Sequence, residues 1–206
     1  MSPGWFVTFE GGDGAGKSTQ LAAIARLAHL RGHEVVSCRE PGGTTLGERL
    51  REALFGLDAA PSATAELLTF AAARAELVAK VIAPALDAGS LVLCDRFADS
   101  TLAYQGHGRG IDLGSIEAIN AVATGGLRPD LTVLLDLPPA VGRARGQQGG
   151  SDYLEREQLA FHERVRAGFL ALAAAEPARW LVLDAALPPH ELTELAWRRI
   201  DGLISG

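Results

Sequence analysis

The sequence has few cysteines and no long apolar runs. Its 206 residues include only Cys38 and Cys94, which lack the C-x-x-C spacing of a redox or metal pair. We therefore expect two buried, free thiols in a reducing compartment, the cytoplasm. No apolar run approaches the roughly 18–20 residues needed to cross a bilayer. Residues Met1–Gly4 show no basic region followed by a long apolar core, so we expect no signal peptide.

A basic excess is also absent, because the formal net charge is −6. A protein that follows a nucleic-acid backbone needs clustered Lys and Arg, so the charge argues against a nucleic-acid partner. It does not argue against mononucleotides, which need only a few local cations. Hydrophobic residues make up 48% and charged residues 21%, as in ordinary globular proteins. We expect a single domain over residues 1–206.

Five short segments predict β-strands. They are almost wholly apolar rather than alternating, which is typical of parallel strands covered on both faces. Helical segments lie between them, and this alternation indicates an α/β fold with a five-stranded parallel sheet flanked by helices. The predicted strands are Trp5–Glu10, Glu34–Cys38, Ser90–Cys94, Leu131–Asp136 and Trp180–Asp184.

The helical segments are marked by apolar spacing and by their ends. Lys17–Arg31 is predicted to be a helix that ends at Gly32. Two or three helices are expected over Thr45–Ala88, where Pro84 should kink or restart the last one. The segment Gly146–Ser151 reads G-Q-Q-G-G-S between two helical segments, so we interpret it as a flap rather than a domain boundary.

A phosphate-binding loop follows the first predicted strand and opens the first helix. Its sequence fits G-x-x-x-x-G-K-[ST], and this context supports the assignment. The glycines let several N–H groups face one anion, and the helix N-terminus adds positive potential. Lys17 can reach the β- and γ-phosphates, and the Ser18 hydroxyl can bind Mg²⁺. The predicted ATP-binding residues are Gly11, Gly12, Asp13, Gly14, Ala15, Gly16, Lys17, Ser18 and Thr19.

This loop alone does not separate a kinase from a nucleotide switch. A guanine-specific switch should carry N-K-x-D after a strand. The segments that follow two of the strands, beginning at Asp136 and Asp184, read D-L-P-P and D-A-A-L instead. The sequence therefore disfavours a GTPase.

A second acid is expected to complete the Mg²⁺ site with Ser18. Asp95 and Asp136 both follow apolar strands, and we favour Asp95 because Arg96 adjoins it. An acid beside an arginine at a strand end suits a metal next to a phosphate. The alternative role for Asp136 is helix capping ahead of Pro138.

Arg143 and Arg145 precede the Gly146–Ser151 flap. A cation there could close over the γ-phosphate and stabilise the charge of a loose transition state. No general base is needed if the acceptor is itself a phosphate, because its oxygens are already nucleophilic near neutral pH.

The whole set of motifs resembles the thymidylate kinase family nearly end to end. The order and spacing are specific to that family among nucleoside-monophosphate kinases. The matching segments are F-E-G-G-D-G-A-G-K-S-T-Q from Phe9, R-E-P-G-G-T from Arg39, F-A-A-A-R from Phe70, D-R-F-A-D-S-T-L-A-Y-Q-G from Asp95, G-R-G from Gly108 and R-P-D from Arg128.

The resemblance implies that ATP phosphorylates dTMP with Mg²⁺, giving dTDP in dTTP biosynthesis. It implies that Asp13 holds the 3′-hydroxyl and that Arg96, with Arg39 nearby, holds the acceptor phosphate. Tyr104 would pack against the sugar C2′ and exclude a ribose hydroxyl.

The resemblance also implies a binding site for the base and a homodimer. Phe70 would stack on thymine and Arg74 would hydrogen-bond its edge. Ser100 and Gln105 would line the base pocket.

The lid, expected at about residues 143–156, departs from the family pattern. Members of the family carry the catalytic arginine either in the P-loop, directly after the acid, or on the lid. Here Gly14 follows Asp13, so the resemblance implies that the lid supplies the arginine. The family's D-R-x-E reads D-Y-L-E over Asp152–Glu155, with Tyr153 in place of arginine. The candidates for this role are Arg143, Arg145 and Arg156.

Two other functions remain open from the sequence. A deoxynucleoside kinase would phosphorylate a hydroxyl and would need a carboxylate base near the 5′ position. A nucleotide-dependent switch or binding protein would bind nucleotide with little phosphoryl transfer, and the lid and second anion site argue against it.

Overall fold

The computed structural model describes residues 4–146 and 152–205. At its centre is the five-stranded parallel sheet that the apolar strands predict. Its strand order is β2-β3-β1-β4-β5. The strands are β1 (Trp5–Glu10), β2 (Val35–Arg39), β3 (Leu91–Asp95), β4 (Leu131–Asp136) and β5 (Trp180–Asp184).

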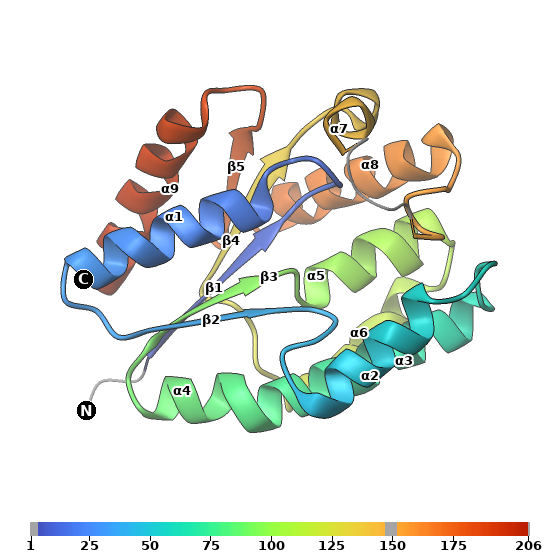
Figure 1. Cartoon of the computed structure of the whole chain (residues 1–206), viewed down its shortest axis with the longest axis horizontal. Helices are drawn as coiled ribbons and strands as arrows, with labels where there is room; N and C mark the ends of the chain where they lie inside the picture. Colours follow the sequence, from blue (N-terminus) through green and yellow to red (C-terminus); the bar gives the residue numbers. More distant parts are fainter. Residues whose placement is uncertain (1–3, 147–151, 206) are drawn as a thin grey trace.

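Helices cover both faces of the sheet (Figure 1). α1 (Lys17–Leu30) and α9 (Pro189–Ile204) lie together on one face. They pack on side chains of one alternation, such as Val7, Phe9 and Val133, which are fully buried. The other alternation, including Phe6 and Val92, faces the opposite layer of helices. Burial on both faces explains why the strands read as apolar runs.

The opposite layer contains most of the remaining helical segments. α2 (Thr45–Phe55), α3 (Ala63–Leu77) and α6 (Leu113–Thr124) form one group beyond the sheet (Figure 1). α8 (Leu159–Ala175) packs on η2 (Leu102–Gly108), which continues the short α5 (Ala98–Thr101). α7 (Pro139–Gly146) follows β4.

Pro84, where the sequence predicts a kink or a new helix, follows a π-helical turn, and the dihedral angles of Ile82 and Ala83 before it are helical. The chain runs from α3 through a π-helical turn, η1 (Val78–Ile82), into α4 (Ala83–Asp87), where Pro84 occupies the first turn. At that position its missing N–H is not required. β2 and β3 each begin and end one residue later than predicted, so Arg39 and Asp95 become their last residues.

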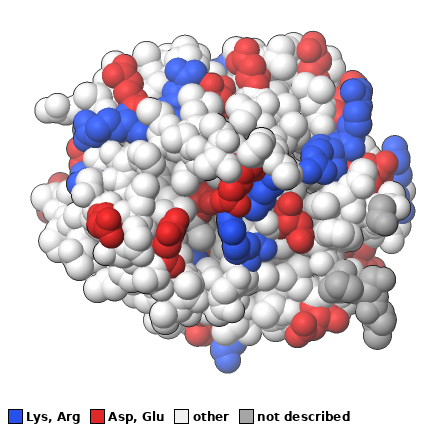
Figure 2. All heavy atoms as spheres, turned by 180° about the vertical axis from the view of Figure 1, so that it is seen from behind, with Lys and Arg blue, Asp and Glu red and all other residues white. Residues whose placement is uncertain are grey.

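Charges of both signs occur on the surface (Figure 2). Figure 2 shows acidic and basic side chains interspersed among uncharged ones on the face seen from behind. Within the described ranges, no helix is long and apolar enough to cross a membrane. Cys38 and Cys94 are free thiols that lie in register on β2 and β3, and Cys94 is buried.

Candidate active site

The phosphate-binding loop joins the end of β1 to the start of α1. Gly11, Gly14 and Gly16 adopt φ angles of 139°, 73° and 90°, which residues with a Cβ rarely adopt. Lys17 lies across the loop, and its Nζ donates to the carbonyls of Gly11 (3.2 Å) and Gly12 (2.9 Å). Burial, reinforced by the charge of Arg96, lowers the pKa of Lys17 to about 8. An arriving phosphate would favour its charged form.

The structure brings Ser18 and Asp95 together. The Ser18 hydroxyl donates to Asp95 Oδ2 at 2.6 Å, so two oxygen ligands adjoin at the carboxyl end of β3. Asp136, the alternative acid, directs both carboxylate oxygens to Arg166 on α8, each at 2.7 Å. This ion pair replaces the capping role that the sequence suggested for Asp136. Oxygen ligands suit Mg²⁺, which also keeps water and phosphate ligands.

Arg96 is the central cation of the site. Its guanidinium donates to the carbonyl of Gly11 (3.0 Å), to Asp13 Oδ1 (2.7 Å) and to the Tyr104 hydroxyl (3.2 Å). It also lies 5.0 Å from the centre of the Tyr104 ring. Although burial opposes ionisation of Asp13, Arg96 and Lys17 together lower its pKa. Arg96 is thus held beside the phosphate-binding loop in its charged form.

A cavity of about 160 Å³ opens beside Arg96 and contains most of the predicted acceptor residues. We call it the smaller cavity. Phe70 forms part of its wall and packs edge-on against Phe55, with ring centroids 6.4 Å apart. Gln105 is buried and donates to Glu66 at 2.7 Å. The predicted residues that line this cavity are Asp13, Phe70, Arg74, Arg96, Ser100, Tyr104 and Gln105.

Arg74 is held by an extensive polar network. It is 1% exposed, and its guanidinium donates to both oxygens of Glu40, to Asn120, to the carbonyl of Phe97 and to Thr101. Burial raises the pKa of Glu40, which Arg74 opposes. The network fixes the arginine at the cavity wall before any ligand arrives.

Arg39 does not lie in the smaller cavity. Its side chain is 56% exposed and pairs with Glu48 at 3.1 Å, which also accepts from the backbone of Gly43. Arg51 on α2 lines the cavity instead, donating to the carbonyl of Pro41 at 3.0 Å and stacking on Phe55. Arg51, in the second turn of α2, therefore lines the cavity where the sequence suggested Arg39.

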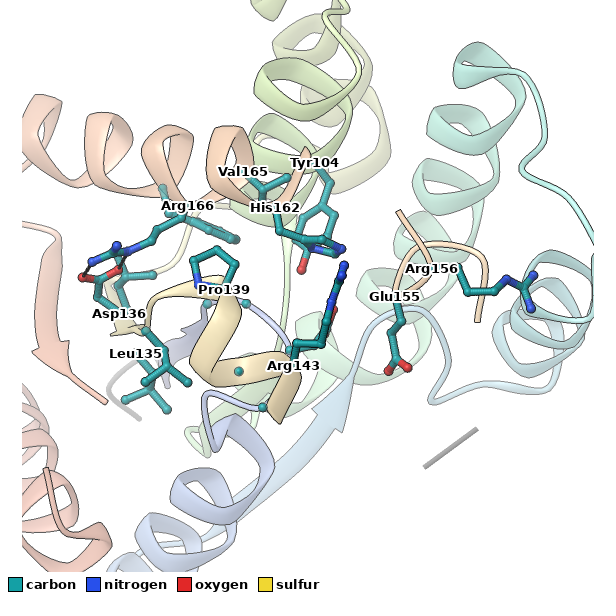
Figure 3. Close-up of a pocket in the computed structure, with 18 residues that line it drawn as sticks. Tyr104, Leu135, Asp136, Pro139, Arg143, Glu155, Arg156, His162, Val165 and Arg166 are labelled. Carbon is teal, nitrogen blue, oxygen red and sulfur yellow. Dashed lines mark hydrogen bonds and ion pairs between the residues drawn. The ribbon is translucent and has the colours of Figure 1, made fainter. Parts of the chain in front are cut away.

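A second, larger cavity of about 720 Å³ (Figure 3) shares Asp13, Tyr104 and Glu155 with the smaller one. Arg143 points into it toward His162. α7 carries Arg143 and packs directly on the phosphate-binding loop. A Cβ at Gly14 would lie only 2.3 Å from the carbonyl oxygen of Gly142, so a glycine at this position allows α7 to approach the loop.

The other two lid arginines bind different backbone carbonyls, although Arg156 also lines the larger cavity. Arg145 donates to the carbonyl of Ala185, beyond the end of β5, at 3.0 Å. Arg156 points away from Arg143 (Figure 3), and its guanidinium donates to the carbonyl of Asp58 at 3.1 Å. Of the three candidates, Arg143 directly follows Gly142, whose carbonyl packs on the phosphate-binding loop at Gly14.

The residues that follow the flap lie beside the smaller cavity. The flap positions 147–151 fall outside the described residues. Tyr153 is buried with its ring 6.1 Å from that of Phe55, while Asp152, Leu154 and Glu155 line the smaller cavity. Tyr153 therefore serves as a packing residue rather than as the arginine that the family pattern expects.

Sequence reasoning missed several residues of this site. Glu10, Glu40 and Glu66 are fully or almost fully buried carboxyl groups. Glu40 and Glu66 accept from arginines, and Glu10 accepts from the backbone N–H of Phe97. Glu10 and Glu40 each lie within a matched motif, at the end of an apolar strand, where a charge is unexpected. That position was the available signal for both. Glu66 and Arg51 had no comparable signal.

Comparison with known proteins gives one consistent result. A family model described as thymidylate kinase matches residues 9–195. A thymidylate kinase of Synechococcus sp. (strain JA-3-3Ab) is 56% identical, and the match covers 93% of each chain. A thymidylate kinase of Deinococcus radiodurans is 52% identical, and the match covers 97% of this chain and 98% of the relative. The crystal structure of thymidylate kinase from Ehrlichia chaffeensis superposes with a TM-score of 0.79 at 36% identity, covering 97% of this chain and 99% of its own.

Proposed function

This chain belongs to the thymidylate kinase family, and we propose that it transfers the γ-phosphoryl group of ATP to dTMP held in the smaller cavity. It is a nucleoside-monophosphate kinase, and its products are dTDP and ADP. The observation that carries the proposal is the position of Arg96, which joins the phosphate-binding loop at Gly11 to the cavity that contains Phe70 and Arg74.

On the donor side, the loop amides, the α1 N-terminus and Lys17 would bind the ATP phosphates. Ser18 and Asp95 would hold Mg²⁺, because their oxygens already lie 2.6 Å apart. Mg²⁺ bound there would neutralise charge that builds up on the phosphate oxygens. Among the residues that the structure describes, no cluster of three or more His, Cys, Asp or Glu could form a protein-only cage for a metal. A metal shared between two protein oxygens and phosphates fits this arrangement.

On the acceptor side, Arg96 and Arg51 would bind the phosphate of dTMP. Phe70 offers a ring face for thymine, and Arg74 is fixed where it can reach the edge of the base. The acceptor phosphate would sit next to the γ-phosphate because Arg96 touches both the loop and this cavity. Positioning of this kind supplies much of the acceleration in phosphoryl transfer.

Arg143 would be the lid arginine. It leaves α7 where that helix touches Gly14, and its side chain points along the larger cavity that runs from the loop. Its guanidinium donates to the carbonyl of Glu157 at 2.7 Å, so it bridges α7 to the segment before α8. A small movement of that segment would carry the cation to the transferring group.

The test is an assay of ADP release from ATP·Mg²⁺ with thymidine, dTMP, dUMP, UMP, AMP or no acceptor. We expect strong turnover with dTMP, weaker turnover with dUMP and background with the others. The difference between dTMP and dUMP should be modest, since one methyl group is worth about 1–3 kcal/mol. Turnover with thymidine but not dTMP would identify a deoxynucleoside kinase. Turnover without any acceptor would identify an ATPase.

A homodimer is also proposed, through α3 and α6, which pack together and expose apolar side chains. Leu68 on α3 is 51% exposed and Val122 on α6 is 86% exposed. A second copy would cover them. Val122→Glu should lower the mass measured by sedimentation to that of one chain, and an unchanged dimer would place the interface elsewhere. The two free thiols favour the cytoplasm as its location.

A further inference from the structure

Arg96 has an unusual backbone conformation. Its φ of 71° is the only positive value among the non-glycine residues that the structure describes. The left-handed region costs a residue with a Cβ roughly 1 kcal/mol or more, so neighbouring groups must hold it there. The turn matters because it aims the guanidinium at the phosphate-binding loop and the smaller cavity.

Glu10 contacts this turn at two points. It is the last residue of β1 and is fully buried. One carboxyl oxygen accepts from the backbone N–H of Phe97 at 2.8 Å, directly after the strained residue. The other lies 2.5 Å from the Ser100 hydroxyl, and that hydroxyl accepts from Arg96 Nη1 at 3.3 Å. One side chain thus binds both the backbone beyond Arg96 and a partner of its guanidinium.

Two further contacts fix only the backbone of the turn. The N–H of Arg96 donates to the carbonyl of Phe9 at 3.0 Å, and the Cys94 thiol donates to the carbonyl of Arg96 at 3.1 Å. Neither reaches the guanidinium. Glu10 is therefore the group that links the backbone geometry of Arg96 to the direction of its side chain.

We propose that Glu10 is a positioning residue for the acceptor phosphate, acting through the Phe97 amide and the Ser100 hydroxyl to aim Arg96. This inference rests on the proposed function, in which Arg96 binds the phosphate of dTMP. Glu10 touches no substrate itself. Its removal should therefore weaken recognition of the phosphate and leave recognition of the nucleoside and of ATP largely intact.

The test compares the affinities of dTMP and thymidine, measured by calorimetry, because the two ligands differ only in the phosphate. In Glu10→Ala we expect the preference for dTMP over thymidine to fall by at least about tenfold, since small misplacements of a positioning group are costly. The KM for ATP should stay within about twofold. Glu10→Gln can still accept from Phe97 and donate to Ser100, so it should keep most of the preference.

Two more variants separate positioning from damage to the core. Glu10→Asp keeps the carboxyl group but is one methylene shorter, so it should lose the preference as Glu10→Ala does. It also provides the test if Glu10→Ala does not fold. Thr132→Val removes a hydroxyl that is also fully buried, on β4, and that bonds Asp99 and Arg179 rather than Arg96. It should lower Tm and leave the preference unchanged.

The inference is overturned if folded Glu10→Asp keeps the wild-type preference, or if Thr132→Val loses as much of it. Loss in Glu10→Gln equal to that in Glu10→Asp would also overturn it. Failure of the proposed function would look different, because the wild-type protein would then bind dTMP no better than thymidine and would not phosphorylate it.

Discussion

The two cavities, which share Asp13, Tyr104 and Glu155, differ in size and in lining. The larger, of about 720 Å³, is lined by leucines with Val165 and Phe169, and also by Arg143, Arg156 and Arg166. The smaller, of about 160 Å³, is lined by three arginines, two phenylalanines and buried polar groups. Size alone would favour the larger as the binding site. The smaller contains the groups that a nucleotide monophosphate requires, so residue chemistry is here the better guide.

A pair of arginines tests this comparison with the largest expected effect. Arg96→Ala should lower kcat/KM for dTMP by about 10³-fold, because it removes a charge fixed at the reacting phosphates. Arg166→Ala, which removes a cation from the larger cavity, should change it by less than about threefold. Steady-state kinetics with dTMP measures both. Equal losses would mean that the larger cavity takes part in binding the acceptor.

Lys17→Ala probes the donor side, which both cavities share through the phosphate-binding loop. Turnover should fall by about 10²-fold or more, because Lys17 acts on charge that develops on the transferring group. Lys17→Arg is the matched control, because it keeps the positive charge but replaces the compact ammonium with a planar guanidinium. Near-normal kcat in folded Lys17→Ala protein would remove the loop from the mechanism.

Tyr104→Ala removes part of the wall between the two cavities. Its ring is 5% exposed and packs edge-on against Phe161 and Phe169. Without the ring there is space for a ribose hydroxyl, so the preference for dUMP over UMP should fall by about tenfold, the effect of about 1–3 kcal/mol of lost discrimination. Tyr104→Phe, which keeps the ring, should retain the preference. An unchanged preference in Tyr104→Ala would assign the exclusion of ribose to another residue.

The buried carboxyl of Glu10 gives a smaller, pH-dependent effect. Burial, followed by the charge of Asp99, raises its pKa from 4.5 to about 8. Between these values the native state binds more protons than the unfolded state, so the free energy of unfolding falls as pH rises. The slope from this group is at most about 1.4 kcal/mol per pH unit.

Urea unfolding at pH 5, 6, 7 and 8 measures this slope. Glu10→Gln does not titrate, so the difference in stability between wild type and Glu10→Gln should change across this range by a few kcal/mol. A constant difference would show that Glu10 is already ionised at pH 5 in the folded protein.

Much of the fold and the donor site could be predicted from the sequence, because each depends on neighbouring residues. Apolar strands on both faces predict the parallel sheet, and the P-loop is one continuous segment between β1 and α1. Asp95 and Arg96 could be located from the sequence because they lie at the carboxyl end of an apolar strand, β3. The strand ends themselves were uncertain by one residue, since the boundary depends on pairing partners.

The acceptor side was harder, because long side chains choose among partners that only the fold brings close. Arg39 directly precedes two residues that line the cavity, Glu40 and Pro41, yet an ion pair with Glu48 keeps its side chain out of the cavity. The role of Glu10 depends on a turn 86 positions later that carries an unusual φ. No local pattern predicts such a contact, and the larger cavity likewise arises only where α7, α8 and β4 meet.

The most direct test of the account is a crystal structure with dTMP, Mg²⁺ and a non-hydrolysable ATP analogue. We expect the dTMP phosphate to contact Arg96 and the thymine ring to stack on Phe70, with Mg²⁺ beside Ser18 and Asp95. Density for dTMP in the larger cavity, beside Arg166 and His162, would contradict the account.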